Sequence, residues 1–353
     1  TAAEADALLA TAAAGASGHA RDIVPLMDET AYARAFYQVK ALIAAGDTYQ
    51  VNLTFKAGFR LDGDPVALYR NLVARQQVAY GALINTGTHW LLSRSPELFV
   101  SSCGDTLAAR PMKGTLGRGP TPEEDEARRA ALGADEKNRA ENLMIVDLLR
   151  NDLGRVAEVG SVRVTDLYKV ETYSTLHTMT SGITARRRPG VTTTELLTNL
   201  FPCGSITGAP KLRAMEIIHD VEAGSRGVYT GSIGHFAPNG DLTLNVAIRT
   251  AVIDMNGRGE IGIGGGVVAD STAQDEYREA LLKMAFFSEP AEPVTLIETL
   301  RWDRDDGYAL LDRHLERLAT SAAHFVLPFD RDAILALLET QNFSDSPMRV
   351  RLT

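Results

Sequence analysis

The sequence predicts a mixed fold, α+β or α/β, organised around a large antiparallel sheet. Helix-type and strand-type patterns mix along its 353 residues, with no internal repeat and no low-complexity block. A hydrophobic content of 45% with 23% charged residues is typical of a soluble globular protein. This length suffices for one large core or for two domains.

The composition argues against several classes of function. A net charge of -9 is wrong for a nucleic-acid surface, which needs a clustered excess of Lys and Arg. No apolar run approaches the ~20 residues that span a bilayer. Cys103 and Cys203 lack metal-type spacing, so we expect a protein of the reducing cytoplasm. Because the chain begins at Thr1 and stops at Thr353 without a terminal signal, we expect a fragment at both ends.

The first elements follow from periodicity. A single apolar face predicts a helix over Glu29–Ala45, and Gly46 ends it. That face consists of Tyr32, Ala35, Phe36, Val39 and Ile43. Alternation over Thr48–Phe55 predicts a strand. Further short strands are expected at Leu83–Ile84, Trp90–Ser93 and Leu98–Ser101, followed by a helix-rich stretch over Pro122–Leu153.

The later part of the chain contains a glycine break and a linker. Gly262–Gly266 is expected to break the chain before a helix over Thr272–Phe287. The closely spaced prolines of Glu289–Pro293 predict a linker. A strand near Val294–Arg301 and a helix near Arg313–His324 are expected after it. The predicted domains are therefore 1–288 and 294–353, joined by residues 289–293.

Lys113 stands out because of its neighbours, in the run Arg110-Pro111-Met112-Lys113-Gly114-Thr115. A lysine close to proline and glycine lies on backbone that is neither regular helix nor regular strand interior. A buried lysine readily loses its charge, and a neutral amine is a nucleophile. The alternative is a solvated lysine in a turn.

Glu276, Glu279 and Lys283 are spaced so that one helix face carries all three. Ser271 with Gln274 predicts a capping box at the start of this helix. The preceding glycines 264–266 would let backbone amides approach an anion. Such a set could hold Mg²⁺ together with a carboxylate ligand, because Mg²⁺ prefers few protein ligands and hard oxygens. The alternative is a solvated helix face with a Glu279–Lys283 ion pair.

A second helix carries Glu141 at the edge of an apolar run, in a stretch that also holds Lys137. An acidic side chain there either faces solvent at the end of the helix or binds a metal. Two helices that each give one glutamate to a single Mg²⁺ would form an economical site, but periodicity alone does not choose between these interpretations.

Several ordered motifs resemble the chorismate-utilising enzymes, in particular component I of aminodeoxychorismate synthase. The resemblance covers about residues 30 to 288 and includes the Arg249 strand, the triple glycine and the Glu276/Glu279/Lys283 helix. The other motifs are Gly46-Asp47-Thr48-Tyr49-Gln50-Val51-Asn52-Leu53, Ser95-Pro96-Glu97, Pro111-Met112-Lys113-Gly114-Thr115, the run from Glu141 to Asp152, and Gly204-Ser205-Ile206-Thr207-Gly208-Ala209-Pro210-Lys211.

The resemblance implies an α/β sandwich with one Mg²⁺-dependent chorismate site. Glu141 and Glu279 match the metal ligands of the family, with Glu276 close to the same ion, and Glu97 matches the general acid/base. His177 matches an active-site histidine, although a lone histidine is more often a satisfied core residue. The groups that match substrate contacts are Tyr229, Arg249, Gly265, Gly266 and Lys283 for the carboxylates, with Thr115 and Thr207 on the pocket wall. Asn138 replaces an acidic residue found in some relatives, so the charge around the metal is expected to be lower.

Two positions indicate which nucleophile attacks the ring. Relatives that activate water carry lysine where this chain has Gln50, and glutamine has no basic nitrogen. Relatives that form anthranilate carry a small residue where this chain has Lys113. The resemblance implies a covalent route in which the Lys113 amine adds to C2 of chorismate, and ammonia then displaces it by adding at C4. The product would be 4-amino-4-deoxychorismate, a precursor in p-aminobenzoate and folate biosynthesis.

The tail resembles the start of a fold-type IV pyridoxal-phosphate enzyme, such as aminodeoxychorismate lyase. The resemblance rests on Ile297-Glu298-Thr299-Leu300-Arg301 and on Arg313-His314-Leu315-Glu316-Arg317-Leu318. Arg317 matches the arginine that binds the cofactor phosphate. The lysine that binds the cofactor would lie beyond residue 353, so pyridoxal phosphate is expected only in a complete domain. We therefore expect a piece of a synthase–lyase fusion; the alternative is an amphipathic helix with a charged outer face.

Other functions remain possible at this stage. Anthranilate synthase component I is the closest enzymatic alternative, and a catalytically inactive scaffold that binds an amidotransferase is the non-enzymatic one. A P-loop is excluded because Ala209-Pro210 separates Gly208 from Lys211. Neither cysteine lies in a nucleophile-elbow pattern, so a separate glutamine amidotransferase subunit is expected to supply ammonia.

Overall fold

The computed structural model describes residues 2–12, 15–76, 78–173, 176–288, 295–325, 327–341 and 346–353. The chain divides into two compact units, one of residues 1–119 and 125–291 and one of residues 120–124 and 292–353. The predicted linker, residues 289–293, lies outside the described residues. Among the described helices, none is long and apolar enough to cross a membrane.

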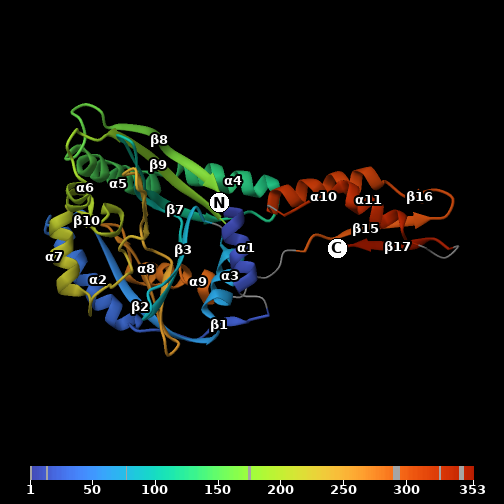
Figure 1. Cartoon of the computed structure of the whole chain (residues 1–353), viewed down its shortest axis with the longest axis horizontal. Helices are drawn as coiled ribbons and strands as arrows, with labels where there is room; N and C mark the ends of the chain where they lie inside the picture. Colours follow the sequence, from blue (N-terminus) through green and yellow to red (C-terminus); the bar gives the residue numbers. More distant parts are fainter. Residues whose placement is uncertain are drawn as a thin grey trace. The chain divides into compact units, whose positions relative to one another are not determined.

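The first sheet of the larger unit has the strand order β1-β2-β14-β13-β4-β3, and β10 pairs with β2 (Figure 1). All of these pairings are antiparallel. The strands are β1 (Gly18–Pro25), β2 (Gln50–Gly63), β3 (Tyr80–Asn85), β4 (His89–Ser95), β10 (Gly208–Ala209), β13 (Thr250–Asp254) and β14 (Arg258–Val267). The predicted strand at Thr48–Phe55 is therefore the first half of the longer strand β2.

The second sheet has the order β11-β12-β5-β6-β9-β7, and β8 pairs with β9. It is also antiparallel throughout. Its strands are β5 (Leu98–Cys103), β6 (Thr106–Arg110), β7 (Met112–Gly117), β8 (Arg163–Thr172), β9 (Leu176–Arg186), β11 (Gly234–Phe236) and β12 (Leu242–Asn245). The mixed fold with large antiparallel sheets is thus the one that the sequence predicts.

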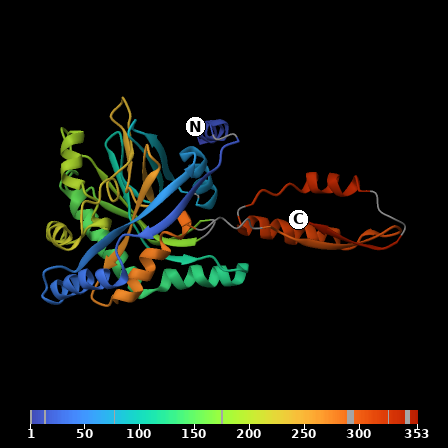
Figure 2. The same ribbon diagram turned by 90° about the horizontal axis from the view of Figure 1, so that it is seen from below.

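Helices cover these sheets and complete two hydrophobic cores. They are α1 (Ala2–Ala12), α2 (Glu29–Ala44), α3 (Pro65–Arg75), α4 (Pro122–Ala134), α5 (Glu136–Gly154), α6 (Thr193–Leu200), α7 (Lys211–Val221), α8 (Ala273–Leu282) and α9 (Ala285–Ser288). Figure 2 shows α2 beside α8, and Tyr32 and Phe36 of α2 are buried against the first sheet. In the second core, Ile145 and Leu149 of α5 pack with Ile183 of β9.

The smaller unit contains a three-stranded antiparallel sheet and two helices. The sheet order is β16-β15-β17, with β15 (Glu298–Asp303), β16 (Gly307–Tyr308) and β17 (Met348–Leu352). The helices are α10 (Leu311–Phe325) and α11 (Arg331–Glu339). The predicted helix near Arg313–His324 corresponds to α10. The predicted strand starts at Val294, outside the described residues, whereas β15 begins at Glu298.

The predicted helix-rich stretch Pro122–Leu153 is confirmed as α4 and α5, and Asp135 separates them by capping α5 through the Asn138 N–H. Two other local predictions need correction. The predicted helix over Thr272–Phe287 likewise forms α8 and then α9. Its N-cap is Thr272, which accepts from the Asp275 N–H, and not Ser271. The Ser271 hydroxyl donates instead to the Glu276 carboxylate, at 2.7 Å.

The triple glycine is strand interior rather than a break in the chain. Gly264, Gly265 and Gly266 lie in β14 opposite Thr54, Leu53 and Asn52 of β2. A Cβ atom on Gly264 would lie 2.4 Å from the Leu53 carbonyl oxygen, inside van der Waals contact. Glycine is therefore required there for close approach of the backbones, and no turn is needed to explain it.

We expect Gly264→Ala to destabilise the protein by about 1–3 kcal/mol, because backbone atoms would have to move to admit the methyl group. Gly154→Ala is the matched control, since a Cβ atom at the end of α5 meets nothing within 4 Å. The control should leave stability unchanged or raise it by up to about 1 kcal/mol. Urea unfolding followed by circular dichroism measures both; equal stabilities of the two variants would contradict the packing described for β14.

Candidate active site

Lys113 lies at a β-bulge. In the pairing of β7 with β9, Lys113 lies opposite Met179 and Thr115 lies opposite Thr178, so Gly114 is the extra residue. Gly114 has a φ of +80°, the left-handed region that favours glycine, and its carbonyl oxygen accepts from the Thr178 hydroxyl at 3.0 Å. Bulges re-aim the neighbouring side chains of a strand. The proline–glycine run therefore forms irregular strand, as the sequence indicates.

The side chain of Lys113 reaches across to the first sheet. A Cβ atom on Gly266 would lie 3.3 Å from Lys113 Nζ and 2.9 Å from Gln50 Nε2. Three predicted site residues thus meet at the end of β14. Gln50 is fully buried, and neither atom of its amide has a hydrogen-bonding partner among the described residues. Such an amide is costly to leave unsatisfied, so Gln50 is available to a ligand or to water.

Glu97 lies between β4 and β5 in a turn fixed by Ser95. The Ser95 hydroxyl donates to the Val246 carbonyl oxygen at 2.6 Å, and the Glu97 N–H donates to Ser95 Oγ. The carboxyl group is only 3% exposed. Burial raises the pKa of Glu97 to about 7, although the Ser205 hydroxyl, the Lys113 charge and the Met112 N–H oppose that rise. Glu97 is therefore partly protonated near neutral pH and can act as an acid or as a base.

The face of α8 brings Glu276, Glu279 and Lys283 onto β14. Lys283 Nζ lies 2.8 Å from the Glu279 carboxylate and donates to the Gly264 carbonyl oxygen at 3.0 Å. A Cβ atom on Gly265 would lie 2.8 Å from Glu276 Oε2 and 3.4 Å from Lys283 Nζ. Gly265 thus leaves room for Glu276 and Lys283. The Glu279–Lys283 ion pair, which was the alternative interpretation of this helix face, is present beside these glycines.

The two glutamates of α8 have opposite pKa shifts. Burial and the nearby Glu279 charge raise the pKa of Glu276, although the Ser271 hydroxyl opposes the rise. The Glu279 side chain is 57% exposed, so its partial desolvation works only weakly against ionisation. The charges of Lys283 and Lys113 outweigh that effect and lower the pKa of Glu279. Because the Lys113 charge acts on both Glu97 and Glu279, these predicted residues belong to one site.

Glu141 lies on α5. Lys137, one helical turn before Glu141, contributes a charge that lowers the pKa of both Glu276 and Glu279. Within the described part of the chain, however, no group of three His, Cys, Asp or Glu side chains is placed to hold a metal. The glutamate oxygens suit Mg²⁺, which keeps several waters and accepts ligands from a substrate. The donor set therefore fits Mg²⁺ only if water or substrate completes it.

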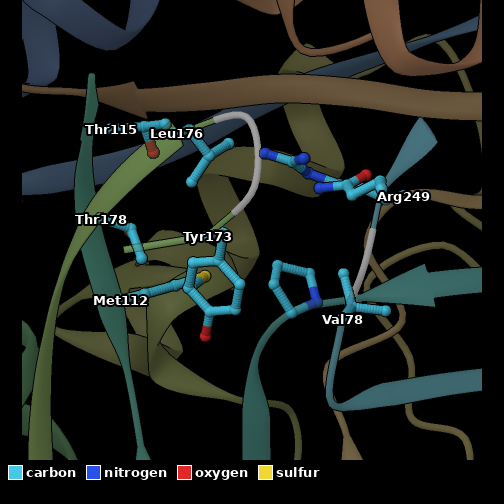
Figure 3. Close-up of a pocket in the computed structure, with 9 residues that line it drawn as sticks. Val78, Met112, Thr115, Tyr173, Leu176, Thr178 and Arg249 are labelled. Carbon is cyan, nitrogen blue, oxygen red and sulfur yellow. The ribbon is translucent and has the colours of Figure 1, made fainter. Parts of the chain in front are cut away.

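Arg249 and Thr115 line a small cavity of about 20 Å³, together with Tyr173, Leu176, Thr178 and other residues (Figure 3). Arg249 has a φ of +50°, and its guanidinium lies 5.7 Å from the centre of the Phe286 ring. Burial lowers the pKa of Arg249 to about 10. In the described residues no carboxylate pairs with it, so Arg249 is a desolvated cation available to an anionic ligand.

Thr207 and Tyr229 line a second, larger cleft of about 610 Å³ beside α7. The Thr207 hydroxyl donates to the Cys203 carbonyl oxygen at 3.1 Å. The Tyr229 ring packs on Gly262, where a Cβ atom would lie 2.1 Å from Tyr229 Cγ. Burial raises the pKa of Tyr229, so it stays a neutral hydrogen-bonding group. Thr115 and Arg249 therefore line one cavity, and Thr207 and Tyr229 line another that shares no residue with it. The other predicted substrate-binding residues line neither of these two: His177, Gly265, Gly266 and Lys283.

His177 is fully buried and its ring nitrogens are occupied. Nε2 lies 2.9 Å from Asp125 Oδ1, and Nδ1 lies 2.9 Å from Thr172 Oγ1. Arg118 pairs with the same Asp125 carboxylate at 2.8 Å and lowers its pKa. His177 could contact a ligand only if one of these bonds opened. Its role in substrate binding stays a prediction.

Arg317 binds Glu298 within the smaller unit. Its Nε donates to Glu298 Oε1 at 2.7 Å, and His314 Nδ1 lies 2.7 Å from Oε2. Glu298 is 3% exposed, and the Arg317 hydrogen bond lowers its pKa to about 2. The predicted phosphate contact of Arg317 stays a prediction, and it would compete with Glu298 for the guanidinium.

Sequence reasoning missed two groups that lower the pKa of Glu97 against the effect of burial, the Ser205 hydroxyl and the Met112 N–H. A backbone N–H has no sequence signal. Ser205 belongs to the motif Gly204–Lys211, but nothing in that run indicates that its hydroxyl reaches a turn a hundred residues earlier in the chain.

Comparisons with known proteins agree on one family of relatives. A family model described as chorismate binding enzyme matches residues 3–289. The chain is 46% identical over 245 residues to a chloroplastic aminodeoxychorismate synthase of Arabidopsis thaliana, covering 68% of this chain. It is 41% identical over 271 residues to aminodeoxychorismate synthase component 1 of Bacillus subtilis, covering 77% of this chain. The chain spans 27% of the plant protein and 57% of the bacterial one.

Solved structures agree on the fold. The crystal structure of anthranilate synthase component I from Streptococcus pneumoniae superposes with a TM-score of 0.70 at 34% identity, covering 76% of this chain and 59% of that one. MenF, the menaquinone-specific isochorismate synthase of Escherichia coli, gives a TM-score of 0.67 at 20% identity. The latter covers 78% of this chain and 64% of that one, and at this identity it supports the fold alone.

We expect Arg249→Met to leave stability unchanged or to raise it by about 1 kcal/mol, because it removes a half-buried cation that has no carboxylate partner in the described structure. The small cation–π contribution from Phe286 would be lost at the same time. Binding of a dicarboxylate substrate should weaken in the same variant. Thermal unfolding measures the stability of the variant, and substrate titration measures its loss of affinity.

Arg94→Met is the matched control for that prediction. Arg94 is also buried, but its guanidinium donates to the Gln76 carbonyl oxygen and to the Tyr69 hydroxyl. Its loss leaves a buried acceptor unsatisfied, so we expect destabilisation by about 1–3 kcal/mol. If Arg249→Met destabilised the protein as much as Arg94→Met, Arg249 would be a structural residue.

Proposed function

The chain belongs to the chorismate binding enzyme family, and on this basis we propose that it aminates chorismate to 4-amino-4-deoxychorismate. The proposed reaction depends on Mg²⁺ and uses ammonia from a glutamine amidotransferase partner. Its product would serve p-aminobenzoate and folate biosynthesis. The curated relatives named aminodeoxychorismate synthase support the choice of product.

One observation carries the proposal: the Lys113 side chain lies in the same site as the buried Glu97 carboxyl group. The Lys113 charge lowers the pKa of Glu97 against the effect of burial, so the two groups are close enough to interact. A nucleophile beside an acid of suitable pKa is what displacement of a hydroxyl group requires. A lysine with only a structural role would not need this neighbour.

The proposed chemistry has two displacements. The Lys113 ammonium first gives a proton to the Glu97 carboxylate. Its neutral amine then forms a bond to C2 of the ring, the ring double bonds shift, and the C4–O bond breaks. Glu97 gives its proton to the departing hydroxyl, which leaves as water. Ammonia then forms a bond at C4, the double bonds shift back, and the C2–N bond to Lys113 breaks. The proton lost by the incoming amine restores Glu97, so the enzyme returns to its starting state.

Glu276 and Glu279 of α8, with Glu141 of α5, would hold the Mg²⁺. When bound, the ion would neutralise a ring carboxylate of the substrate. Lys283 pairs with Glu279, which supports the proposal that it binds the same carboxylate beside the ion. Arg249 is a suitable partner for the second carboxylate because it is desolvated and faces a cavity.

The source of ammonia is proposed to be another protein. Burial raises the pKa of the Cys203 thiol to about 12, so Cys203 is a poor nucleophile. Cys103 is exposed at the end of β5, and no histidine in the described structure is paired with it. Neither thiol therefore resembles the nucleophile of a glutaminase.

Anthranilate synthase component I remains the second candidate, because the solved structure at 34% identity has that title. Lys113 speaks against it, since the reaction at C2 that yields anthranilate gives no role to a lysine amine at that place. The mass and fluorescence of the product distinguish the two enzymes. A scaffold without activity would give neither product with chorismate, Mg²⁺ and ammonium.

Lys113→Met should reduce ammonia-dependent turnover of chorismate by roughly 10³-fold or more, because the variant lacks the attacking amine. Lys56→Met is the control; Lys56 pairs with Glu260 across β2 and β14 at 2.8 Å and should be dispensable. Product formation followed by chromatography measures both. Full activity of Lys113→Met would exclude the covalent route.

Glu279→Gln should raise the Mg²⁺ concentration needed for half-maximal activity by at least about 10-fold, because one anionic oxygen ligand is lost. Calorimetric titration of Mg²⁺ into the protein gives a readout that does not depend on turnover. Asp275→Asn, one helical turn before Glu279, is the control and should leave the affinity unchanged, because the Asp275 carboxylate accepts from the Thr272 hydroxyl at 2.6 Å. An unaltered affinity in Glu279→Gln would remove Glu279 from the metal site.

A further inference from the structure

The ammonium group of Lys40 lies among backbone carbonyl oxygens. Lys40 is half-buried on α2, and its Nζ donates to the carbonyl oxygens of Val268, Ala269 and Ser271. The distances from Nζ to the Val268 and Ser271 oxygens are both 3.3 Å. An ammonium group donates three hydrogen bonds and accepts none, so three carbonyl oxygens match it. The Phe36 ring, one helical turn earlier, has its centre 5.9 Å from Nζ and adds an attractive π face.

The three acceptors belong to the turn of residues 268–271, which joins β14 to α8. The Ser271 N–H donates to the Val268 carbonyl oxygen, and the Val268 N–H donates to Ser271 Oγ, each at 3.1 Å. These bonds close the turn, and three of its carbonyl oxygens converge on one point. Their partial negative charges repel one another, so a positive charge at that point stabilises the turn. Carbonyl oxygens grouped in this way also replace the water shell of K⁺ in selectivity filters.

The same turn holds the Glu276 carboxyl group. The Ser271 hydroxyl donates to Glu276 Oε1 at 2.7 Å, and both residues are only 7% exposed. The other oxygen, Oε2, lies 2.8 Å from the position that a Cβ atom on Gly265 would take. One oxygen of Glu276 is thus fixed by the turn, and the other lies at the glycine strand of the proposed site.

Lys40 is therefore linked to Glu276 through Ser271. The Ser271 carbonyl oxygen accepts from Lys40, and the hydroxyl of the same residue donates to Glu276. A carboxylate binds a metal best when its own hydrogen bonds fix its orientation. Movement of the turn would displace Ser271 Oγ and free Glu276 to rotate.

The helix that carries Glu276 has further contacts that do not involve Lys40. The Tyr277 ring of α8 stacks on Phe55 of β2, with 5.4 Å between the ring centres. The Tyr277 hydroxyl donates to the Met27 carbonyl oxygen at 3.0 Å. Loss of the Lys40 ammonium should therefore disturb the turn more than α8 itself.

We propose that the Lys40 ammonium acts as a built-in monovalent cation. By neutralising the carbonyl oxygens of the turn it positions the Ser271 hydroxyl and, through it, the Glu276 carboxylate of the Mg²⁺ site. Lys40 is thus a positioning residue that touches neither the substrate nor the metal. The inference rests on the proposed function, because it takes from there the role of Glu276 at the metal.

The first test replaces the ammonium group by a free ion. Lys40→Ala removes the side chain beyond Cβ and leaves space beside the turn for K⁺. About 0.2 M potassium chloride should raise the Tm of this variant by at least about 2 °C relative to tetramethylammonium chloride of the same ionic strength. The wild type should show no such difference, because its own ammonium fills the place. Equal responses of the variant and the wild type would overturn the proposal.

The second test is calorimetric titration of Mg²⁺ into the protein without chorismate. In tetramethylammonium chloride, Lys40→Ala should bind Mg²⁺ at least about 3-fold more weakly than the wild type, and potassium chloride should restore the affinity to within about 2-fold. A merely structural lysine would lower the Tm without this effect on Mg²⁺. An unchanged affinity, or a loss that potassium does not restore, would overturn the proposal.

Arg75→Ala is the matched control. Arg75 also donates to backbone carbonyl oxygens, those of Phe286 and Phe287, which lie in α9 and not in the turn. This variant can lose stability, but it should keep the Mg²⁺ affinity of the wild type in both salts.

Ser271→Ala tests the second link if Lys40→Ala fails to fold. It keeps Lys40 and removes the hydroxyl that fixes Glu276. Its Mg²⁺ affinity should fall by about 10-fold, equally in both salts, because the ammonium still occupies the carbonyl oxygens. An unchanged affinity in Ser271→Ala would also overturn the proposal.

These measurements do not depend on turnover, so they separate the inference from the proposed function. If the variants behave as expected but the wild type makes no 4-amino-4-deoxychorismate from chorismate and ammonium, the proposed function is wrong and the role of Lys40 stands. If the wild type makes that product while Lys40→Ala keeps its Mg²⁺ affinity in tetramethylammonium chloride, the role of Lys40 is wrong and the proposed function stands.

Discussion

The burial of the Glu97 carboxyl group next to Lys113 is the constraint on which the account of this site depends. A carboxyl group in water would be ionised at neutral pH and could not protonate a departing hydroxyl. Burial brings the pKa of Glu97 to about 7, and the charge of Lys113 keeps it from rising further. The same lysine is close to Gly266 of the other sheet. Lys113 thus lies near both the Glu97 acid and the glycine strand β14, where we propose that the ring of the substrate binds.

The glycines of β14 make this arrangement possible. Gly264 allows β2 to approach, Gly265 leaves room for Glu276 and Lys283, and Gly266 leaves room for Gln50 and Lys113. A strand with side chains at these positions would close the space between the sheet and α8. The three consecutive glycines therefore have three different partners, and together they define the floor of the site.

The sequence was sufficient for the mixed fold, for helices such as α2, and for most of the residues that meet in the site. Helix faces and strand alternation can be predicted because they depend on the spacing of residues that are close in the sequence. It did not show that the triple glycine is strand interior, because the reason lies in the neighbouring strand and in α8, which are distant in the chain. It placed the helix cap at Ser271, because Ser271 and Thr272 are both good caps and only tertiary contact with Glu276 decides between them. The influence of Ser205 and of the Met112 N–H on the pKa of Glu97 had no local signal either.

Mass spectrometry of the protein quenched during reaction with chorismate, in the absence of ammonia, tests the central claim most directly. The account predicts that Lys113 carries an adduct with the mass of chorismate less one water, and that added ammonium removes it as product appears. If ammonium yields 4-amino-4-deoxychorismate while Lys113 stays unmodified at every quench time, the covalent role of Lys113 is contradicted.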